Sequence, residues 1–193
     1  MRVSVGGPGR LLQLTQGDIT REPVEALVTA ANRGLAGGGG VDGAIHRAAG
    51  PELLAECRKH PGGCPPGQAV ATLPGRLPPP VRRVIHAVGP IFGEHEGEED
   101  ELLASAHRRA LEVAEAEGCR TIAFPAISCG VYGYPVPRAA RVALGTIVAH
   151  LLRPACTLRE VRYVLFSAQD LETFQAALRE VLTAEPRLRE EGP

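Results

Sequence analysis

Apolar and polar residues follow two alternating patterns along the chain, which predict strands and helices in succession. Short apolar runs typical of strands in a sheet cover residues 11–18, 25–32, 68–74, 82–90, 120–128 and 160–167. Apolar positions recur with helical spacing at 41–60, 101–118, 137–152 and 171–182. This alternation favours an α/β fold, with helices covering both faces of a parallel or mixed sheet.

The length of 193 residues suits one domain. We expect it to span residues 1–182, followed by a flexible tail over 183–193, where turn-forming and charged residues prevail. The net charge of −1 gives no general attraction to nucleic acid or to a membrane surface. The chain has no apolar run long enough to span a bilayer, no signal-peptide pattern and five scattered cysteines, so we expect a cytoplasmic protein.

Four consecutive glycines, Gly37–Gly40, lie between a predicted strand and a predicted helix. Bare backbone lets a ligand approach closely, and the N–H groups at a helix N-terminus suit a phosphate. Asp42 and His46 lie four residues apart and share one face of this helix. Asp42 is equally explained as a carboxylate that complements the helix dipole, and His46 is typical of a packed core histidine. Asn32, the sole asparagine, ends the preceding strand and could simply cap the turn.

A second glycine-bearing loop, FPAISCGVYGYP at 124–135, follows another predicted strand. Its backbone N–H groups could bind an anion, although a plain strand-to-helix connection would also fit the pattern. Ligands of α/β sheets bind beyond the carboxyl ends of the strands. Two glycine loops at that edge therefore favour a diphosphate.

Four segments together resemble the macrodomain family, and most closely its MacroD-type branch, which hydrolyses ADP-ribose conjugates. They are GDIT (17–20), AAN…GGGGVDGAIH (30–46), VIHAVGP (84–90) and PAISCGVYGYP (125–135). The resemblance extends from about Leu11 to Leu182. It implies a three-layer α/β/α single domain with a mixed central sheet and an ADP-ribose cleft at the strand ends.

The same resemblance implies a role for individual residues. Asp18 would accept a hydrogen bond from the adenine amino group, Ile19 would adjoin it, and Phe166 would stack on adenine. Asn32 would hold the distal ribose and Asp42 would lie near its anomeric carbon, as the two catalytic residues. The diphosphate would lie between two backbone segments, one of Gly39, Gly40 and Val41 and the other of Ser128, Cys129, Gly130, Val131 and Tyr132.

The implied reaction is hydrolysis of mono-ADP-ribosyl esters on Asp or Glu of proteins, or of O-acetyl-ADP-ribose. It needs an activated water and stabilisation of positive charge on the ribose. Asp42 would orient or deprotonate that water and Asn32 would fix the sugar. The reaction requires no metal and no cofactor. We expect ADP-ribose or an ADP-ribosylated substrate as the partner, no membrane, and no nucleic acid except an ADP-ribosylated end.

One position departs from the family pattern, and other functions compete. The branch usually reads Asn-Ala-Ala-Asn, whereas this chain reads Thr29-Ala-Ala-Asn32. Thr29 either serves as a structural substitute for the first asparagine or slows turnover.

A reader that binds ADP-ribose without hydrolysis, or an ADP-ribose-1″-phosphate phosphatase, remains an alternative. Cys57-x-x-His60-x-x-x-Cys64 offers three zinc ligands without a clear fourth. His46 and His86 we interpret as structural residues.

Overall fold

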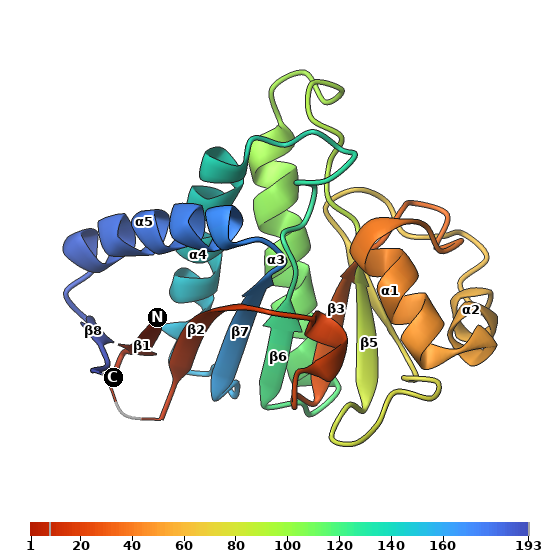
Figure 1. Cartoon of the computed structure of the whole chain (residues 1–193), viewed down its shortest axis with the longest axis horizontal. Helices are drawn as coiled ribbons and strands as arrows, with labels where there is room; N and C mark the ends of the chain where they lie inside the picture. Colours follow the sequence, from red (N-terminus) through yellow and green to blue (C-terminus); the bar gives the residue numbers. More distant parts are fainter. Residues whose placement is uncertain (8, 193) are drawn as a thin grey trace.

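The computed structural model describes residues 1–7 and 9–192, and within them the chain forms eight strands, five α-helices and one short 3-10 helix (Figure 1). The strands are β1 (Arg2–Val5), β2 (Leu11–Gln16), β3 (Ala26–Ala30), β4 (Ala69–Thr72), β5 (Arg83–Ala87), β6 (Thr121–Phe124), β7 (Glu160–Leu165) and β8 (Leu188–Glu190). The helices are η1 (Ile19–Arg21), α1 (Gly40–Ala49), α2 (Pro51–Cys57), α3 (Glu99–Ala116), α4 (Val136–Leu151) and α5 (Ala168–Ala184).

All strands join one mixed sheet in the order β4-β5-β3-β6-β7-β2-β1-β8. The five strands from β5 to β2 run parallel, whereas β4, β1 and β8 pair antiparallel at the two sides. Helices α3, α4 and α5 share one apolar core with the sheet, and α1 and α2 share another with its opposite face (Figure 1). The predicted three-layer α/β/α architecture with a mixed sheet is confirmed.

Side chains of the central strands alternate between these two cores. In β3, Val28 packs with the α3–α5 core and Leu27 with the α1 core. Thr29 is therefore directed toward α1. Its partner in the register of β5 is His86, which follows the same alternation and lies on the same face. Strand periodicity thus brings two buried polar side chains beneath α1.

The predicted helix at 41–60 is divided in two. Gly50 has a φ of 75°, a left-handed conformation that ends α1 and lets α2 begin at Pro51. Strand β1, which is four residues long, was not predicted, since so short a run shows little periodicity.

Regular structure continues beyond residue 182, within the segment 183–193 that was expected to be a flexible tail. Helix α5 extends to Ala184, and β8 pairs with β1, with Leu188 opposite Val5 and buried. The pairing depends on a partner strand at the far end of the chain, which local composition does not reveal. Within the described residues, no helix combines the length and the apolar character needed to cross a membrane.

Candidate functional site

The residues expected to bind a ligand lie on loops at one edge of the sheet. Strands β3, β6, β7 and β2 are parallel neighbours, so their carboxyl ends meet at this edge (Figure 1). The segments that follow them are 31–39, 125–135, 166–167 and 17–21. These segments, with the first turn of α1, contain every residue expected to bind or react. The prediction that both glycine loops share one edge is confirmed.

The first glycine loop ends in an uncapped helix start. Gly39 is the N-cap of α1 and supplies no side chain, and the first helical hydrogen bond is donated by Gly43 N to Gly39 O at 3.1 Å. The N–H groups of Gly40, Val41 and Asp42 therefore have no partner within the helix. Such groups, at the positive end of the helix dipole, are suited to an anion.

Asn32 holds this loop in place. Its amide donates to Gly37 O at 2.8 Å and accepts from Ala36 N at 3.2 Å. The loop also packs tightly on its own helix, because a Cβ atom at Gly43 would lie 2.5 Å from Gly38 O. Asn32 thus shapes the glycine run in addition to any contact with a sugar.

Asp42 is a buried carboxylate, 5% exposed, in the first turn of α1. Thr29 Oγ1 donates a hydrogen bond to its Oδ1 at 2.7 Å, and His46 Nε2 lies 3.7 Å from the same oxygen. The second carboxylate oxygen, Oδ2, faces the glycine run. It lies 3.5 Å from the point that a Cβ atom on Gly38 would occupy, and Asn32 Nδ2 lies 3.8 Å from the same point. Asp42 and Asn32 therefore converge on the backbone at Gly38.

The second loop is held in a strained turn against the segment that follows β5. Ser128 has a φ of 65°, and its Oγ is buried without a hydrogen-bond partner among residues 1–7 and 9–192. A Cβ atom at Gly89 would clash with Ser128 Oγ and with Ile127, so only glycine fits in VIHAVGP at this place. No role for Gly89 was predicted from the sequence. A glycine directly after a buried strand was nevertheless a signal that another segment approaches the backbone closely there.

The tip of the second loop exposes backbone and apolar side chains. Within the described part of the chain, the N–H groups of Gly130, Val131 and Tyr132 make no backbone hydrogen bond. Val131 is fully exposed and Tyr132 is partly exposed. Tyr134 is instead buried, donates to Asp100 and has a raised pKa because of burial. Tyr134 is therefore a core residue that cannot cover a ligand.

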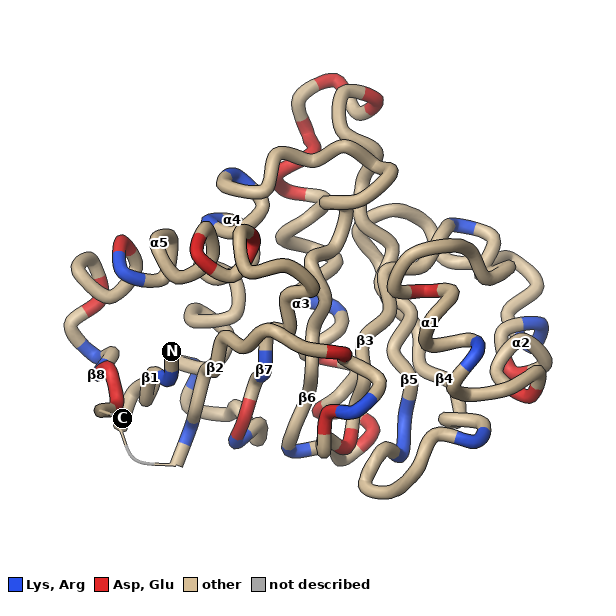
Figure 2. Tube along the Cα trace, viewed as in Figure 1, with Lys and Arg blue, Asp and Glu red and all other residues tan. Residues whose placement is uncertain are grey.

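The glycine-bearing parts of the two loops carry no cationic side chain, although Arg33 directly precedes the first of them and Arg21 lies on the segment after β2. Segments 34–42 and 125–135 contain no Lys or Arg, and acidic residues gather in the loop between β5 and α3 (Figure 2). An anion between these two glycine-bearing segments would be bound by backbone N–H groups and the dipole of α1. That agrees with the near-neutral net charge of −1.

Asp18, Ile19 and Phe166 lie on the loops after β2 and β7. Asp18 Oδ1 accepts from Thr20 N at 2.9 Å and from Thr20 Oγ1 at 2.7 Å, and the hydroxyl bond chiefly lowers the pKa of Asp18. The Ile19 side chain is buried in the α1 core, so only its backbone is available to a ligand. Phe166 is 90% exposed, which is unusual for an aromatic side chain.

The interpretation of His86 as a structural residue agrees with its burial. Its Nε2 lies 2.9 Å from Thr72 Oγ1, and its two ring nitrogens lie 3.9 and 3.7 Å from Cys57 Sγ. Burial lowers the pKa of His86 to about 3 and raises the pKa of Cys57 to about 11, so both are neutral. Cys57 thus faces His46 and His86, and the stretch with His60 and Cys64 does not form a three-ligand cluster among the described residues.

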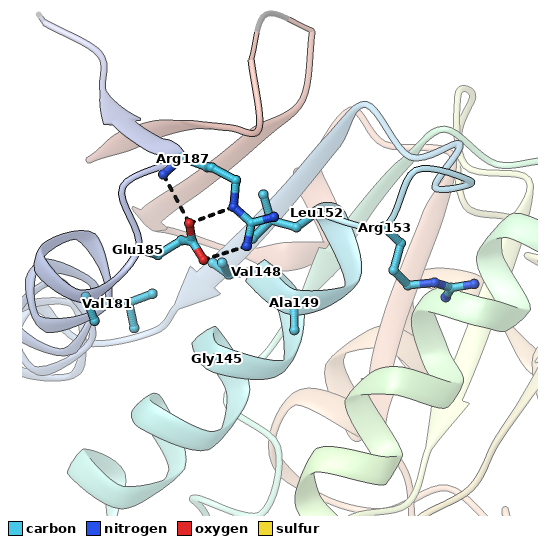
Figure 3. A pocket seen from close by; sticks show the side chains of 9 residues that line it. Gly145, Val148, Ala149, Leu152, Arg153, Val181, Glu185 and Arg187 are labelled. Carbon is cyan, nitrogen blue, oxygen red and sulfur yellow. Dashed lines mark hydrogen bonds and ion pairs between the residues drawn. The ribbon is translucent and has the colours of Figure 1, made fainter.

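A separate groove of about 540 Å³ lies between α4 and α5 (Figure 3). Gly145, Val148 and Val181 line it, and an ion pair of 2.8 Å between Glu185 and Arg187 lies at its side. Both helices start at the carboxyl edge of the sheet, and the groove is formed by their later turns. It contains none of the residues expected to bind a ligand.

Known proteins resemble the chain over nearly its whole length. A family model described as "Macro domain" matches residues 28–143. A Macro domain-containing protein of Caldanaerobacter subterraneus subsp. tengcongensis is 47% identical over 88% of this chain and 97% of its own length. An Escherichia fergusonii protein named O-acetyl-ADP-ribose deacetylase is 46% identical over 86% of this chain and 94% of its own.

A solved structure also superposes closely. It is an Oceanobacillus iheyensis macrodomain variant with ADPR, the abbreviation of ADP-ribose, and has a TM-score of 0.88. It shares 40% identity and covers 95% of this chain and 98% of its own. The family match covers more than half of the chain, and the relatives match nearly all of it. The chain therefore belongs to the Macro domain family.

Proposed function

We propose that this protein binds ADP-ribose at the carboxyl edge of the sheet and hydrolyses ADP-ribose conjugates there. The observation that carries the proposal is the convergence of Asp42 and Asn32 on Gly38, directly beside the free N–H groups at the start of α1. The glycine-bearing segments 34–42 and 125–135 offer backbone N–H groups to a diphosphate and contain no Lys or Arg. The relatives named O-acetyl-ADP-ribose deacetylase support hydrolysis, and the solved structure with ADPR supports the ligand.

In this mechanism each group has a separate task. The N–H groups of Gly39, Gly40 and Val41 bind the diphosphate from one side, and Ser128 to Tyr132 bind it from the other. Asn32 fixes the distal ribose, which aligns the reacting carbon with water. Asp42 accepts a proton from that water or stabilises positive charge on the sugar through Oδ2, because Oδ1 is held by Thr29.

The adenosine half of the ligand is assigned to the loops after β2 and β7. The ionised Asp18 accepts from the adenine amino group, with the Ile19 backbone beside it, and Phe166 stacks on the base. The exposure of Phe166 favours this assignment, because an aromatic ring left in water is suited to stacking. The substrates are mono-ADP-ribosyl esters on Asp or Glu of proteins and O-acetyl-ADP-ribose, and the site of action is the cytoplasm.

The test measures release of ADP-ribose from a glutamate-linked mono-ADP-ribosylated protein and from O-acetyl-ADP-ribose. Asp42→Ala should slow release about 100- to 10,000-fold, the range for loss of a general base, while calorimetry should show that ADP-ribose still binds. Glu52→Ala is the matched control, since Glu52 is an exposed carboxylate in the first turn of α2. Binding without release by the wild type would instead identify a reader, and release of phosphate from ADP-ribose-1″-phosphate alone would identify a phosphatase.

A further inference from the structure

Three side chains behind Asp42 form a compact cluster of metal-binding groups. One ligand atom each from His46 on α1, Cys57 at the end of α2 and His86 on β5 lie within 4.8 Å of one another. A thiol and two imidazoles are the ligands preferred by Zn²⁺ and similar thiophilic cations. We propose that His46, Cys57 and His86 bind a thiophilic divalent cation of the Zn²⁺ type.

The distances are close to those of a tetrahedral zinc site. Zn–S and Zn–N bonds of about 2.3 and 2.0–2.1 Å place tetrahedral ligand atoms about 3.3–3.6 Å apart. Cys57 Sγ lies 3.9 Å from His86 Nδ1 and 3.7 Å from Nε2. The ligand atom of His46 lies within 4.8 Å of the other two, so binding a cation would draw the three side chains somewhat closer together.

Thr72 prepares His86 for this role. Its Oγ1 lies 2.9 Å from His86 Nε2, so this contact engages Nε2 and leaves Nδ1, 3.9 Å from Cys57 Sγ, as the ring nitrogen for a cation. Histidine ligands of metals usually donate their other ring N–H to an oxygen in this way, which fixes the ring and its tautomer. The sheet maintains this arrangement, because Thr72 and His86 lie on adjacent strands, β4 and β5.

A second cluster of similar composition shows why the first is distinctive. Glu115, His150 and Cys156 also lie within 4.8 Å of one another. There His150 Nε2 donates to Glu115 at 2.9 Å, Arg153 donates to His150 Nδ1 at 3.1 Å, and Thr157 N donates to Glu115 at 2.6 Å. Hydrogen bonds within the protein, one of them from the Arg153 guanidinium, already engage the ligand atoms of His150 and Glu115. We therefore interpret this cluster as structural.

In the proposed site the groups are less engaged. Among residues 1–7 and 9–192, Cys57 Sγ contacts only the His86 ring within hydrogen-bonding range, and His46 Nε2 is 3.7 Å from Asp42, beyond a hydrogen bond. The His46 side chain is 15% exposed and gives access from solvent. The fourth ligand would be a water molecule or the Asp42 carboxylate.

The consequence for activity rests on the proposed function. A cation bound by His46 would lie beside Asp42 and compete for the carboxylate that acts on water. Zn²⁺ should therefore inhibit release of ADP-ribose, with the inhibition lost when Cys57 is replaced. Binding of the cation is measured independently of ADP-ribose release. A failure of the proposed cation site can therefore be distinguished from a failure of the proposed function.

The first experiment titrates metal-free protein with Co²⁺ followed by absorption, and with Zn²⁺ followed by calorimetry. We expect one Zn²⁺ per chain and a thiolate-to-cobalt charge-transfer band. Cys57→Ala should abolish the band and weaken Zn²⁺ binding by at least about 100-fold, whereas the matched Cys156→Ala should change neither. Absence of the band in the wild type, or binding that survives Cys57→Ala, would overturn the proposal.

A second variant guards against a folding defect in Cys57→Ala. Thr72→Val keeps all three ligands and removes only the oxygen that orients His86, so Zn²⁺ should bind about 10- to 100-fold more weakly. Circular dichroism without metal checks that both variants are folded. Unchanged Zn²⁺ affinity in a folded Thr72→Val variant would contradict the assignment of His86 as a ligand.

Discussion

The Thr29 hydroxyl donates a hydrogen bond of 2.7 Å to Asp42 Oδ1, beneath the first turn of α1. Both side chains are buried, and the contact joins the central strand β3 to the helix start beside the glycine run. Thr29 replaces an asparagine that the related branch usually carries. The Thr29 hydroxyl therefore supplies a donor to the carboxylate at Oδ1, and Oδ2 makes no hydrogen bond among residues 1–7 and 9–192.

Thr29→Val should lower kcat for ADP-ribose release while leaving KM nearly unchanged. The methyl group fills the same space but leaves Asp42 Oδ1 without its donor, and a hydrogen bond to a charged group contributes about 1.5–3 kcal/mol. We expect kcat to fall about 10- to 100-fold, and Thr29→Ser to restore most of it. Steady-state kinetics on O-acetyl-ADP-ribose make the comparison. Equal kcat values in the wild type and Thr29→Val would show that this bond does not orient the carboxylate.

Much of this arrangement could be predicted from the sequence, because it depends on local patterns. Buried runs such as 25–32 and the glycines before Asp42 determine where β3 ends and α1 begins, and parallel strands place the loops at one edge. The Thr29–Asp42 bond depends instead on how the first turn of α1 packs over the face of β3 that carries Thr29, and the Cys57–His86 contact on packing between α2 and β5. The edge strand β8 depends on a partner 185 residues away, as in the bond from Ser4 to Arg189 O. Local sequence carries no signal for such contacts.

Gly43→Ala should impair the site more than the fold. The added Cβ would lie 2.5 Å from Gly38 O, so the glycine loop must shift away from the start of α1. Because displacement of about 1 Å in a positioning group costs up to about 100-fold in rate, we expect release of ADP-ribose to slow by about 10- to 100-fold. Gly145→Ala is the control, since its Cβ meets open space within α4. A Gly43→Ala variant with normal activity would show that the loop adapts without cost.

Phe166→Ala should weaken binding of ADP-ribose without destabilising the protein. The ring is 90% exposed, so its removal creates no cavity. Stacking of a base on an aromatic ring contributes about 1–3 kcal/mol, which corresponds to about 5- to 150-fold in Kd. Calorimetry compares ADP-ribose with ribose 5-phosphate, which lacks adenine. Phe166→Ala should weaken binding of ADP-ribose and leave binding of ribose 5-phosphate unchanged. Leu73→Ala, at a side chain 50% exposed on the opposite edge, serves as the control. Unchanged Kd for ADP-ribose would remove Phe166 from the adenine site.

The stability of the protein should fall between pH 6.5 and pH 4 because of His107. This histidine is fully buried on α3, donates from Nδ1 to Leu103 O at 2.8 Å and accepts from Tyr163 OH at 3.2 Å. Burial lowers the pKa of His107 to about 4. Between that value and the unfolded pKa of about 6.5, the unfolded chain binds more protons than the folded chain. The stabilising contribution is complete above about pH 6.5 and is lost as the pH falls toward 4.

Urea unfolding at pH 7 and pH 5 measures this effect. For the wild type, the His107 contribution should reduce the free energy of unfolding by about 2 kcal/mol over that interval. His107→Leu removes the titrating group and fills most of its volume, so its loss over the same interval should be smaller by that amount. His86 and His150, whose pKa values are also lowered by burial, remain in both proteins and cancel in the comparison. The same pH dependence in His107→Leu would assign the acid sensitivity to those other histidines.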